Sequence, residues 1–508
     1  MQPMIASRQV SRPTWPRLDA LLLAVLLIAR LRIDTLAEAV GVPLHMNDVP
    51  RQPLLGHLLS DQAMKLLAQQ GLVDPVGMLL IVAALACLVL YLVVSEIHRS
   101  ERVAYRAKLL LIWAILLLTV FAPSIKMMLL RQGSGPASYS HDGGVIQTEA
   151  TVNFLLSGRN PYVEDYTKTP MAEWGINEFR TALYHYPYLP WTFVFSAPFK
   201  VLADHTLGWY DQRMVYLLLF ALTLALLPGL ARQPQTRLLL VMLIGLNPIM
   251  GSDLIYGQND SFVLAWIVLS LWLWVKATEG RERRADTPEK EDSAPGRAGG
   301  RGWYLASAAA FGLACASKPT AWFLAPFYVV LLAGSNELLD QGKGTWERTR
   351  ARLAGTLRSA WPALAAGALI IGPWFVWNPA AMYDDVWRWA NCTSASAYQI
   401  CGWGASNLLL AFGWVSSRFA YWPFWIPELV LGLPLMAWLL WRQLRENSLG
   451  QALWGYGLFI LVFFFVSRFL NENYLGYLVA ILVLGALADA GPRAPAGDQQ
   501  VLPPAKPA

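Results

Sequence analysis

Charged residues are scarce in this chain. Of its 508 residues, only 15% are charged and 56% are hydrophobic, whereas about a quarter of the residues in an ordinary soluble domain are charged. This composition argues against a soluble domain and favours a multi-pass helical membrane protein. The 23 tryptophans and 19 tyrosines fit aromatic belts at two membrane interfaces. The net charge of +6 does not indicate nucleic-acid binding, because basic residues in such proteins mainly set orientation.

Motifs that hold a nucleotide are also absent. Neither G-x-G-x-x-G after a strand nor G-x-x-x-x-G-K-[ST] occurs, so we do not expect a bound nucleotide as donor or energy source. Residues 131–185 contain no His/Cys cluster and no D-x-D, so we assign no metal or other cofactor and leave the metal requirement open. Cysteine is rare as well. Cys392 and Cys401 share a polar loop and are expected to pair only if that loop is extracytoplasmic.

Thirteen apolar segments approach the roughly 20 residues that a helix needs to cross a bilayer. They are residues 18–33, 75–96, 107–130, 186–203, 213–231, 237–255, 260–277, 303–317, 320–335, 357–377, 423–441, 450–467 and 474–489. We therefore predict an all-α fold, a polytopic transmembrane helical bundle of about 12–13 membrane segments. Its extracytoplasmic loops are expected to carry short interfacial helices. The prolines in 186–203 suggest that this segment is re-entrant or broken.

Basic residues predict the orientation of the segments. They gather before the first segment, near 98–108 and near 343–358, and the positive-inside rule places these stretches in the cytoplasm. Both termini are then cytoplasmic. Residues 277–302 mix charges with Gly and Pro and are predicted to be a disordered cytoplasmic linker, and 490–508 a disordered tail. The polar stretches on the extracytoplasmic side are 131–185, 257–260, 317–320, 378–422 and 467–474.

The stretch SYSHDGGVIQTEATVNFLLSGRNPY, residues 138–162, lies between two apolar segments. Its residues 143–157 are predicted to form a helix, which puts Asp142 at the N-cap. Asp142 either only caps this helix, as Asp often does, or presents a general base to a polar cleft. Loops of this length are usually functional or disordered, and the residues alone leave both interpretations open. The polar candidates beside Asp142 for substrate binding are His141, Glu149 and Tyr162.

Two shorter polar stretches interrupt apolar segments. Gln258, Asn259 and Asp260 form either a simple turn or a group that binds sugar hydroxyls. Lys318, in SKPT, stands on the extracytoplasmic side, against the positive-inside trend. A lysine there either reaches a lipid headgroup or binds a phosphate, and we prefer phosphate because ionisable residues near membrane spans are usually functional.

The late stretch FFFVSRFLNENYLGY repeats this pattern. Arg468 and Glu472 form either an i,i+4 pair in a capped hairpin or part of a binding site. In the second interpretation Arg468 is another phosphate-binding cation, with Asn471 and Glu472 on the sugar. The Trp-rich loop 378–413 fits a helix lying in the membrane interface, with Asp384 and Asp385 interpreted as solvated.

Taken together, these stretches resemble the GT-C superfamily of integral-membrane glycosyltransferases, and most of all the bacterial polyprenyl-phosphate-mannose-dependent mannosyltransferases. The motifs that carry the resemblance are HDGG…LLSGRNPY, YHYPYLP, NP…GQND, SKPTAWFLAP, GWGASNLLL and SRFLNENY, in that order. They cover roughly residues 107–489, the expected catalytic domain. Residues 1–106 would then be a cytoplasmic segment and two extra transmembrane helices. These extra helices are one departure from the family. The other is the late motif Asn-Glu-Asn-Tyr, where many relatives have a His-Glu pair.

The resemblance implies a function. Asp142 would be the general base of an inverting sugar transfer, and Lys318 and the motif that begins at Arg468 would bind the donor. The donor would be a polyprenyl-phosphate-linked sugar, either mannose or another hexose or pentose. The acceptor would be a lipid, glycan or protein on the extracytoplasmic face of the plasma membrane, with membrane lipids as further partners.

A rival interpretation is a transporter or flippase of lipid-linked sugars, because broken helices and ionisable residues in the membrane also mark transporters. No inverted repeat is visible, and the polar residues gather on one side. A non-catalytic membrane scaffold explains the polar loops least well.

Overall fold

The computed structural model describes residues 17–69, 73–97, 100–173, 177–285, 299–334 and 345–491. Within these ranges the chain is almost wholly helical, which confirms the predicted all-α class. Strands are confined, in the described ranges, to one parallel pair, β1 (Cys401–Gly402) and β2 (Phe469–Leu470), with Cys401 opposite Phe469.

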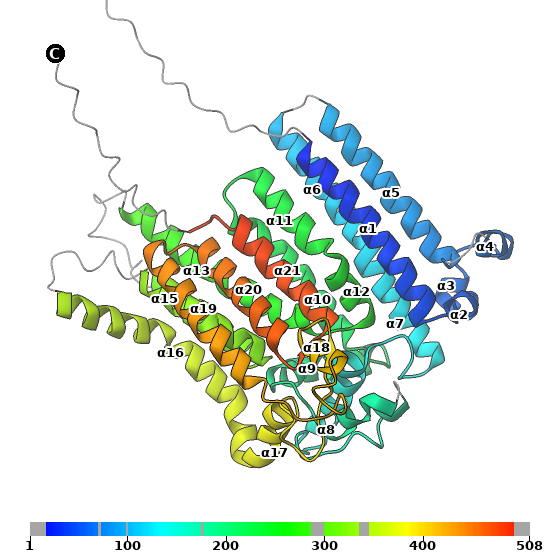
Figure 1. The fold of residues 1–508 in the computed structure, drawn as a ribbon. Coiled ribbons are helices and arrows are strands. Elements are labelled where there is room, and N and C mark those ends of the chain that lie inside the picture. The colour runs from blue at the N-terminus through cyan, green and yellow to red at the C-terminus, as the bar shows by residue number, and fades with distance from the viewer. Residues whose placement is uncertain are drawn as a thin grey trace, which may run out of the picture.

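The first helices form one side of the molecule, drawn in blue and cyan in Figure 1. α1 packs against α5, and α5 against α6, while α6 continues through η1 into α7. The bounds are α1 (Leu18–Gly41), α5 (Pro75–Glu96), α6 (Glu101–Leu116), η1 (Leu117–Phe121) and α7 (Ala122–Ser134). Three short helices join α1 to α5, namely α2 (His45–Arg51), α3 (Pro53–Gly56) and α4 (Asp61–Ala68).

The remaining long helices form the rest of the bundle. They are α10 (Arg213–Leu226), η5 (Leu227–Leu230), α11 (Pro234–Gly245), α12 (Pro248–Tyr256), α13 (Asp260–Ala285), α14 (Gly299–Cys315), η8 (Pro319–Leu324), α15 (Ala325–Gly334), α16 (Thr345–Trp377), α19 (Trp425–Arg445), α20 (Leu449–Val466) and α21 (Glu472–Leu487). Helix α13 extends over 277–285, part of the range predicted as a linker. Residues 286–298 of that range, and 492–508 of the predicted tail, lie outside the described residues.

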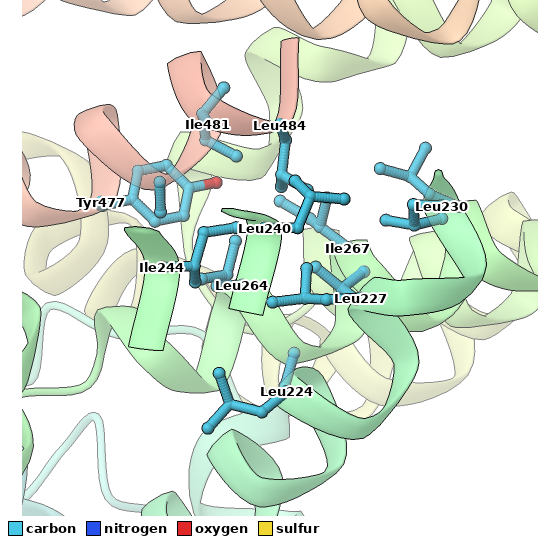
Figure 2. Packing of buried hydrophobic residues seen from close by; sticks show 14 of the residues in the cluster. Leu224, Leu227, Leu230, Leu240, Ile244, Leu264, Ile267, Tyr477, Ile481 and Leu484 are labelled. Carbon is cyan, nitrogen blue, oxygen red and sulfur yellow. The ribbon is translucent and has the colours of Figure 1, made fainter. Parts of the chain in front are cut away.

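The hydrophobic core lies where α10, α11, α13 and α21 meet. In the apolar stretch of α13, 78% is buried, whereas only 11% of the apolar stretch of α16 is buried. Helix α13 is therefore central and α16 is peripheral. Figure 2 shows side chains from all four helices and η5 pointing toward one another: Leu224, Leu227, Leu230, Leu240, Ile244, Leu264, Ile267, Tyr477, Ile481 and Leu484.

Each of the thirteen predicted apolar segments contains a helix within the described residues, but these helices differ in length and charge. Six described stretches are long and apolar enough to cross a membrane, and α11 with α12, bent by 50°, would make a seventh. The other helices are shorter or carry more charge, as α1 does with the fully buried Arg30. The helix formed by the suspected segment 186–203, α9 (Trp191–Thr206), has only 16 residues and contains Pro198.

The short helices gather at one end of the bundle, the lower end in Figure 1. Helix α1 begins and α21 ends at the opposite end. The elements at the lower end are η2 (Asp142–Gln147), α8 (Thr148–Leu156), η3 (Pro170–Glu173), η4 (Asn177–Tyr184), α17 (Pro379–Tyr383), η10 (Asp384–Arg388) and α18 (Ser406–Ala411). We refer to this end of the bundle as the loop end.

Candidate active site

The loop that carries Asp142 packs directly on the turn after α12. The backbone N–H of His141 donates to the Tyr256 carbonyl at 2.7 Å. A Cβ added to Gly144 would overlap the Gly257 carbonyl, and one added to Gly143 would overlap the Tyr188 hydroxyl. Glycine at 144 allows this approach to backbone, so the Asp142 loop lies beside the GQND turn and, through Gly143, beside Tyr188 of the YHYPY stretch.

The predicted helix after Asp142 begins as a π-helix, η2, and continues as α8. Its N-cap is His141, with extended backbone dihedrals and no capping side-chain bond, whereas Asp142 is the first helical residue. The predicted N-cap position of Asp142 is therefore wrong by one residue, because the extended backbone of His141 pairs with Tyr256. The side chain of Asp142 lies outside the described part of the chain.

A buried charged group lies where three polar stretches meet. The Lys318 Nζ atom donates to Asp260 Oδ1 at 2.6 Å and to Asn259 Oδ1 at 3.2 Å. The other carboxylate oxygen of Asp260 accepts from Asn473 of α21. We call Lys318, Asn259, Asp260 and Asn473 the lysine cluster. Lys318 is 6% exposed and Asp260 2% exposed, so the pair is largely shielded from water.

Two aromatic rings flank the ammonium group of this cluster. Lys318 Nζ lies 4.8 Å from the ring centroid of Tyr474 and 5.9 Å from that of Tyr188. Because Tyr188 also packs on Gly143, one ring contacts both the Asp142 loop and the lysine cluster. The loop that carries Asp142 and the cluster of Asn259, Asp260 and Lys318 thus share the Tyr188 ring as a neighbour.

Glu149 belongs to a buried ion network. Its two carboxylate oxygens accept from Arg131 at 2.8 and 2.7 Å, and one also accepts from the Gln212 N–H at 2.8 Å. Arg131 further pairs with Asp211, to which Arg213 donates from two side-chain nitrogens and from its backbone N–H. Arg213 in turn donates to the carbonyls of two further residues, Tyr139 and Ile255. These contacts hold the Asp142 loop on α7 and α10 and occupy both oxygens of Glu149.

The predicted late residues lie at a different contact. Arg468 is 3% exposed and donates to the carbonyls of Tyr398, Arg418 and Ala420. It therefore holds the loop before α19 on β2 and makes no described contact with the lysine cluster. Asn471 donates to the Tyr398 hydroxyl at 3.1 Å. Glu472 is exposed at the start of α21, and the described contacts contain no Arg468–Glu472 pair.

Tyr162 and Gln258 have supporting contacts. Tyr162 is buried among aromatic rings, and its hydroxyl donates to the Tyr188 carbonyl at 2.8 Å. Gln258 is half-buried, and its backbone N–H donates to the Asp253 carbonyl at 2.6 Å. Tyr162 thus fixes the segment that carries Tyr188, and the Gln258 backbone closes the turn.

A second polar cluster joins the two long loops. His185 Nδ1 and Asp385 Oδ1 are 2.9 Å apart, and Asp385 Oδ2 accepts from the Tyr186 N–H at 2.9 Å. The predicted solvation of Asp385 is therefore wrong, since it is 3% exposed. Burial raises the pKa of Asp385 to about 6, although the hydrogen bond from His185 opposes the rise.

Among the described residues, two groups of side chains have metal-ligating atoms close together. In one, the ligand atoms of His185, Asp384 and Asp385 lie within 4.8 Å of one another. In the other, formed by Glu38, His45 and Asp74, the Lys126 ammonium already bonds to both carboxylates.

The thiols of Cys392 and Cys401 are free. They donate to the Phe419 carbonyl and to Asn471 Oδ1, so the disulfide that was expected only for an extracytoplasmic loop is absent.

Sequence reasoning missed Arg131, Asp211, Arg213 and His185. The signal for Asp211 and Arg213 was present in WYDQRM, where charged residues interrupt apolar sequence. His185 stands in the YHYPYLP motif, but its partner is 200 residues away. Pairings of this kind depend on the tertiary fold and leave no local spacing pattern.

Comparison with known proteins agrees with the resemblance seen in the motifs. Residues 150–334 match the family model described as "Alpha-(1->6)-mannopyranosyltransferase, N-terminal domain". The matched range includes the GQND turn and Lys318, and excludes Asp142 and the late motif. Over this range the chain is thus similar to alpha-(1->6)-mannopyranosyltransferases.

Among curated proteins, no match was found. Among solved structures, the crystal structure of ArnT from Cupriavidus metallidurans bound to undecaprenyl phosphate is similar, at 18% identity and a TM-score of 0.35. The match covers 69% of this chain and 55% of that one, so the chain spans about half of that protein's length.

Proposed function

We propose that this chain is a membrane glycosyltransferase that transfers a sugar from a polyprenyl-phosphate donor to an acceptor hydroxyl. The observation that carries the proposal is the contact of the Asp142 loop, through Gly143 and Gly144, with Tyr188 and with the turn that leads into the lysine cluster. One side of the site has a carboxylate-bearing loop and the other has a buried ammonium group. The family match to mannosyltransferases over residues 150–334 makes mannose the first sugar to test.

In this mechanism Asp142 accepts the proton of the acceptor hydroxyl as its oxygen attacks the anomeric carbon. A positioned base of this kind contributes roughly 10²–10⁴-fold to a rate. The bond from the anomeric carbon to the phosphate oxygen breaks, and a lipid phosphate leaves. A single direct displacement inverts the anomeric centre. The sugar itself, whether mannose, another hexose or a pentose, is set by contacts in the polar loops.

Lys318 stabilises the leaving phosphate. Its ammonium already has Asp260 and Asn259 as partners at 2.6 and 3.2 Å, which hold it in position before the donor binds. Fixed charges aimed at the atoms where charge develops lower the barrier without reorganisation during the reaction. The guanidinium of Arg468 donates to three carbonyls. We therefore assign Arg468 to holding the neighbouring loop, and not to the phosphate contact that was predicted for it.

The proposal places the loop end on the extracytoplasmic side and both termini in the cytoplasm. A cysteine at Ser138 or at Asn471 should then react with an impermeant thiol reagent applied to intact cells, whereas one at Ser293 should not. Labelling at Ser293 alone would reverse the orientation. The acceptor, a lipid, glycan or protein, would reach the site from the same side.

The central test is transfer from a polyprenyl-phosphate sugar in purified membranes. The expected result is formation of a new glycosidic bond. The rate should fall roughly tenfold or more in Lys318→Ala and roughly 10²–10⁴-fold in Asp142→Asn. Movement of the intact lipid-linked sugar across the bilayer without bond formation would instead support the transporter interpretation. If Asp142→Asn alone stays active, the base must be sought at Glu149, Glu164 or Asp165.

A further inference from the structure

Arg30 is a fully buried arginine in the middle of α1, outside the family match. A charged side chain inside a membrane bundle is costly and usually has a function. The proposed mechanism does not use Arg30.

The guanidinium group of Arg30 bonds to the backbone at two helix irregularities. Its Nε and Nη2 atoms donate to the Thr119 carbonyl in the π-helix η1, at 3.3 and 3.0 Å. Its Nη1 atom donates to the Asn247 carbonyl, at the bend between α11 and α12, at 3.2 Å. A π-helix and a helix break both alter the regular bonding pattern, and Arg30 supplies donors at both.

The sequence of α12 provides space for this side chain. A Cβ added to Gly251 would overlap the Arg30 guanidinium. Asp34, one turn after Arg30 in α1, pairs with Arg30 at 3.2 Å and accepts from the Ser252 hydroxyl at 2.9 Å. Two successive residues of α12 therefore contact α1.

Helix α12 connects this contact to the lysine cluster. The carbonyl of Asp253, the next residue, accepts from the N–H groups of Gly257 and Gln258 at 2.7 and 2.6 Å, which sets the turn into Asn259 and Asp260. The Asp253 carboxylate lies in the electrostatic field of Asp260 and Glu472 as well as of Lys318 and Arg30. Its Oδ2 atom is buried and has no hydrogen-bond partner among the described residues.

We propose that Arg30 is a positioning residue of the sugar-transfer site, which fixes α12 and thereby the orientation of Asp260 and Lys318. Helix α1 is then a working part of the transferase and not an addition to it. This inference rests on the proposed function, because the site that Arg30 positions is the one assigned to the donor phosphate.

The test compares Arg30→Met with Lys108→Met as a matched control. Lys108 pairs with Asp19 of the same helix α1 at 2.5 Å, so its removal also breaks a contact of α1. Arg30→Met should lower transfer, normalised to folded protein, by roughly 10- to 100-fold, because small displacements of reacting groups cost about this much. Lys108→Met should lower it by less than about threefold, because Asp19 bonds Lys108 and Tyr91, away from the bend at Asn247, and changes at separate sites act independently.

The coupling to Lys318 separates positioning from a general structural role. In a Lys318→Ala background, Arg30→Met should lower transfer by less than about threefold, since residues that act through one another are not additive. Gly251→Ala, which displaces the guanidinium from the other helix, should reproduce the loss. It also provides the test if Arg30→Met fails to fold.

Two results would overturn the inference. One is a double variant whose loss equals the product of the Arg30→Met and Lys318→Ala losses. The other is an Arg30→Met loss no larger than that of Lys108→Met. In that case Lys318→Ala and Asp142→Asn would still be impaired. Full transfer by those last two variants would instead refute the proposed function itself.

Discussion

The Asp260→Asn variant offers the sharpest check on the lysine cluster. Asparagine keeps the size of the side chain and one acceptor oxygen, but it removes the charge that faces Lys318 at 2.6 Å. Breaking a buried pair by removing one partner typically costs about 3–5 kcal/mol, because the other charge stays buried and uncompensated. Asp260→Asn should therefore melt at a clearly lower temperature than the parent protein.

The same change should strengthen phosphate binding. Without the Asp260 carboxylate, the Lys318 ammonium can give its full charge to a lipid phosphate, and a charge-assisted bond contributes about 1.5–3 kcal/mol. The Kd for polyprenyl phosphate should thus fall by roughly tenfold or more. At a lipid concentration tenfold above the parent Kd, bound lipid stabilises the parent by about 1.4 kcal/mol and the variant by about 2.7 kcal/mol.

The assay is thermal unfolding of the purified protein with and without polyprenyl phosphate. Asp204→Asn is the control, because Asp204 pairs with Lys200 at 2.9 Å in an exposed i,i+4 contact, where ion pairs contribute about 0–1 kcal/mol. Equal destabilisation by the two variants would contradict the buried pair. An unchanged lipid-induced shift in Asp260→Asn would show that Lys318 does not meet the phosphate.

Three further variants test the neighbouring loops. Asp142→Asn should keep the fold and lower transfer, normalised to folded protein, by roughly 10²–10⁴-fold; near-parental activity would exclude Asp142 as the base. Glu149→Gln should destabilise the protein by about 3–5 kcal/mol, since it leaves Arg131 with one charged partner. A catalytic loss at an unchanged melting temperature would instead favour Glu149 as the base. The raised pKa of Asp385, about 6 against 3.8, means that the folded state holds this proton more tightly. Its contribution to stability is fully present below pH 3.8 and is lost as the pH rises through about 6. Asp385→Asn should flatten the melting temperature over that range, and an unaltered slope would exclude this carboxyl as its source.

The helical fold could be predicted from the sequence because its cause is local. Runs of apolar residues near the length of a membrane crossing fixed the helix type and most boundaries, and α5 matches its predicted range of 75–96. The bend between α11 and α12 was harder to locate, since Asn247 and Pro248 stand inside an otherwise continuous apolar run. A mean hydropathy taken over the whole run does not reveal such a break.

The candidate site was predictable only in part. Lys318 and Asp260 attracted notice because they are charged residues beside apolar segments, yet their bond to each other joins positions 58 residues apart. The roles of Arg468 and Glu149 were expected to involve substrate. Their polar atoms instead meet carbonyls, an arginine and a backbone amide of the protein itself. Residue type and spacing do not reveal which buried donor finds which acceptor.

The late position of Asn473 and Tyr474 in the chain has a consequence for biosynthesis. Asn473 bonds to Asp260, and the Tyr474 ring flanks Lys318, while β2 pairs with β1 just before them. During synthesis most of the bundle is therefore inserted before the lysine cluster can acquire these partners. A nascent chain stalled before residue 467 would hold Lys318 and Asp260 without Asn473, so catalytic competence should appear only when α21 leaves the ribosome.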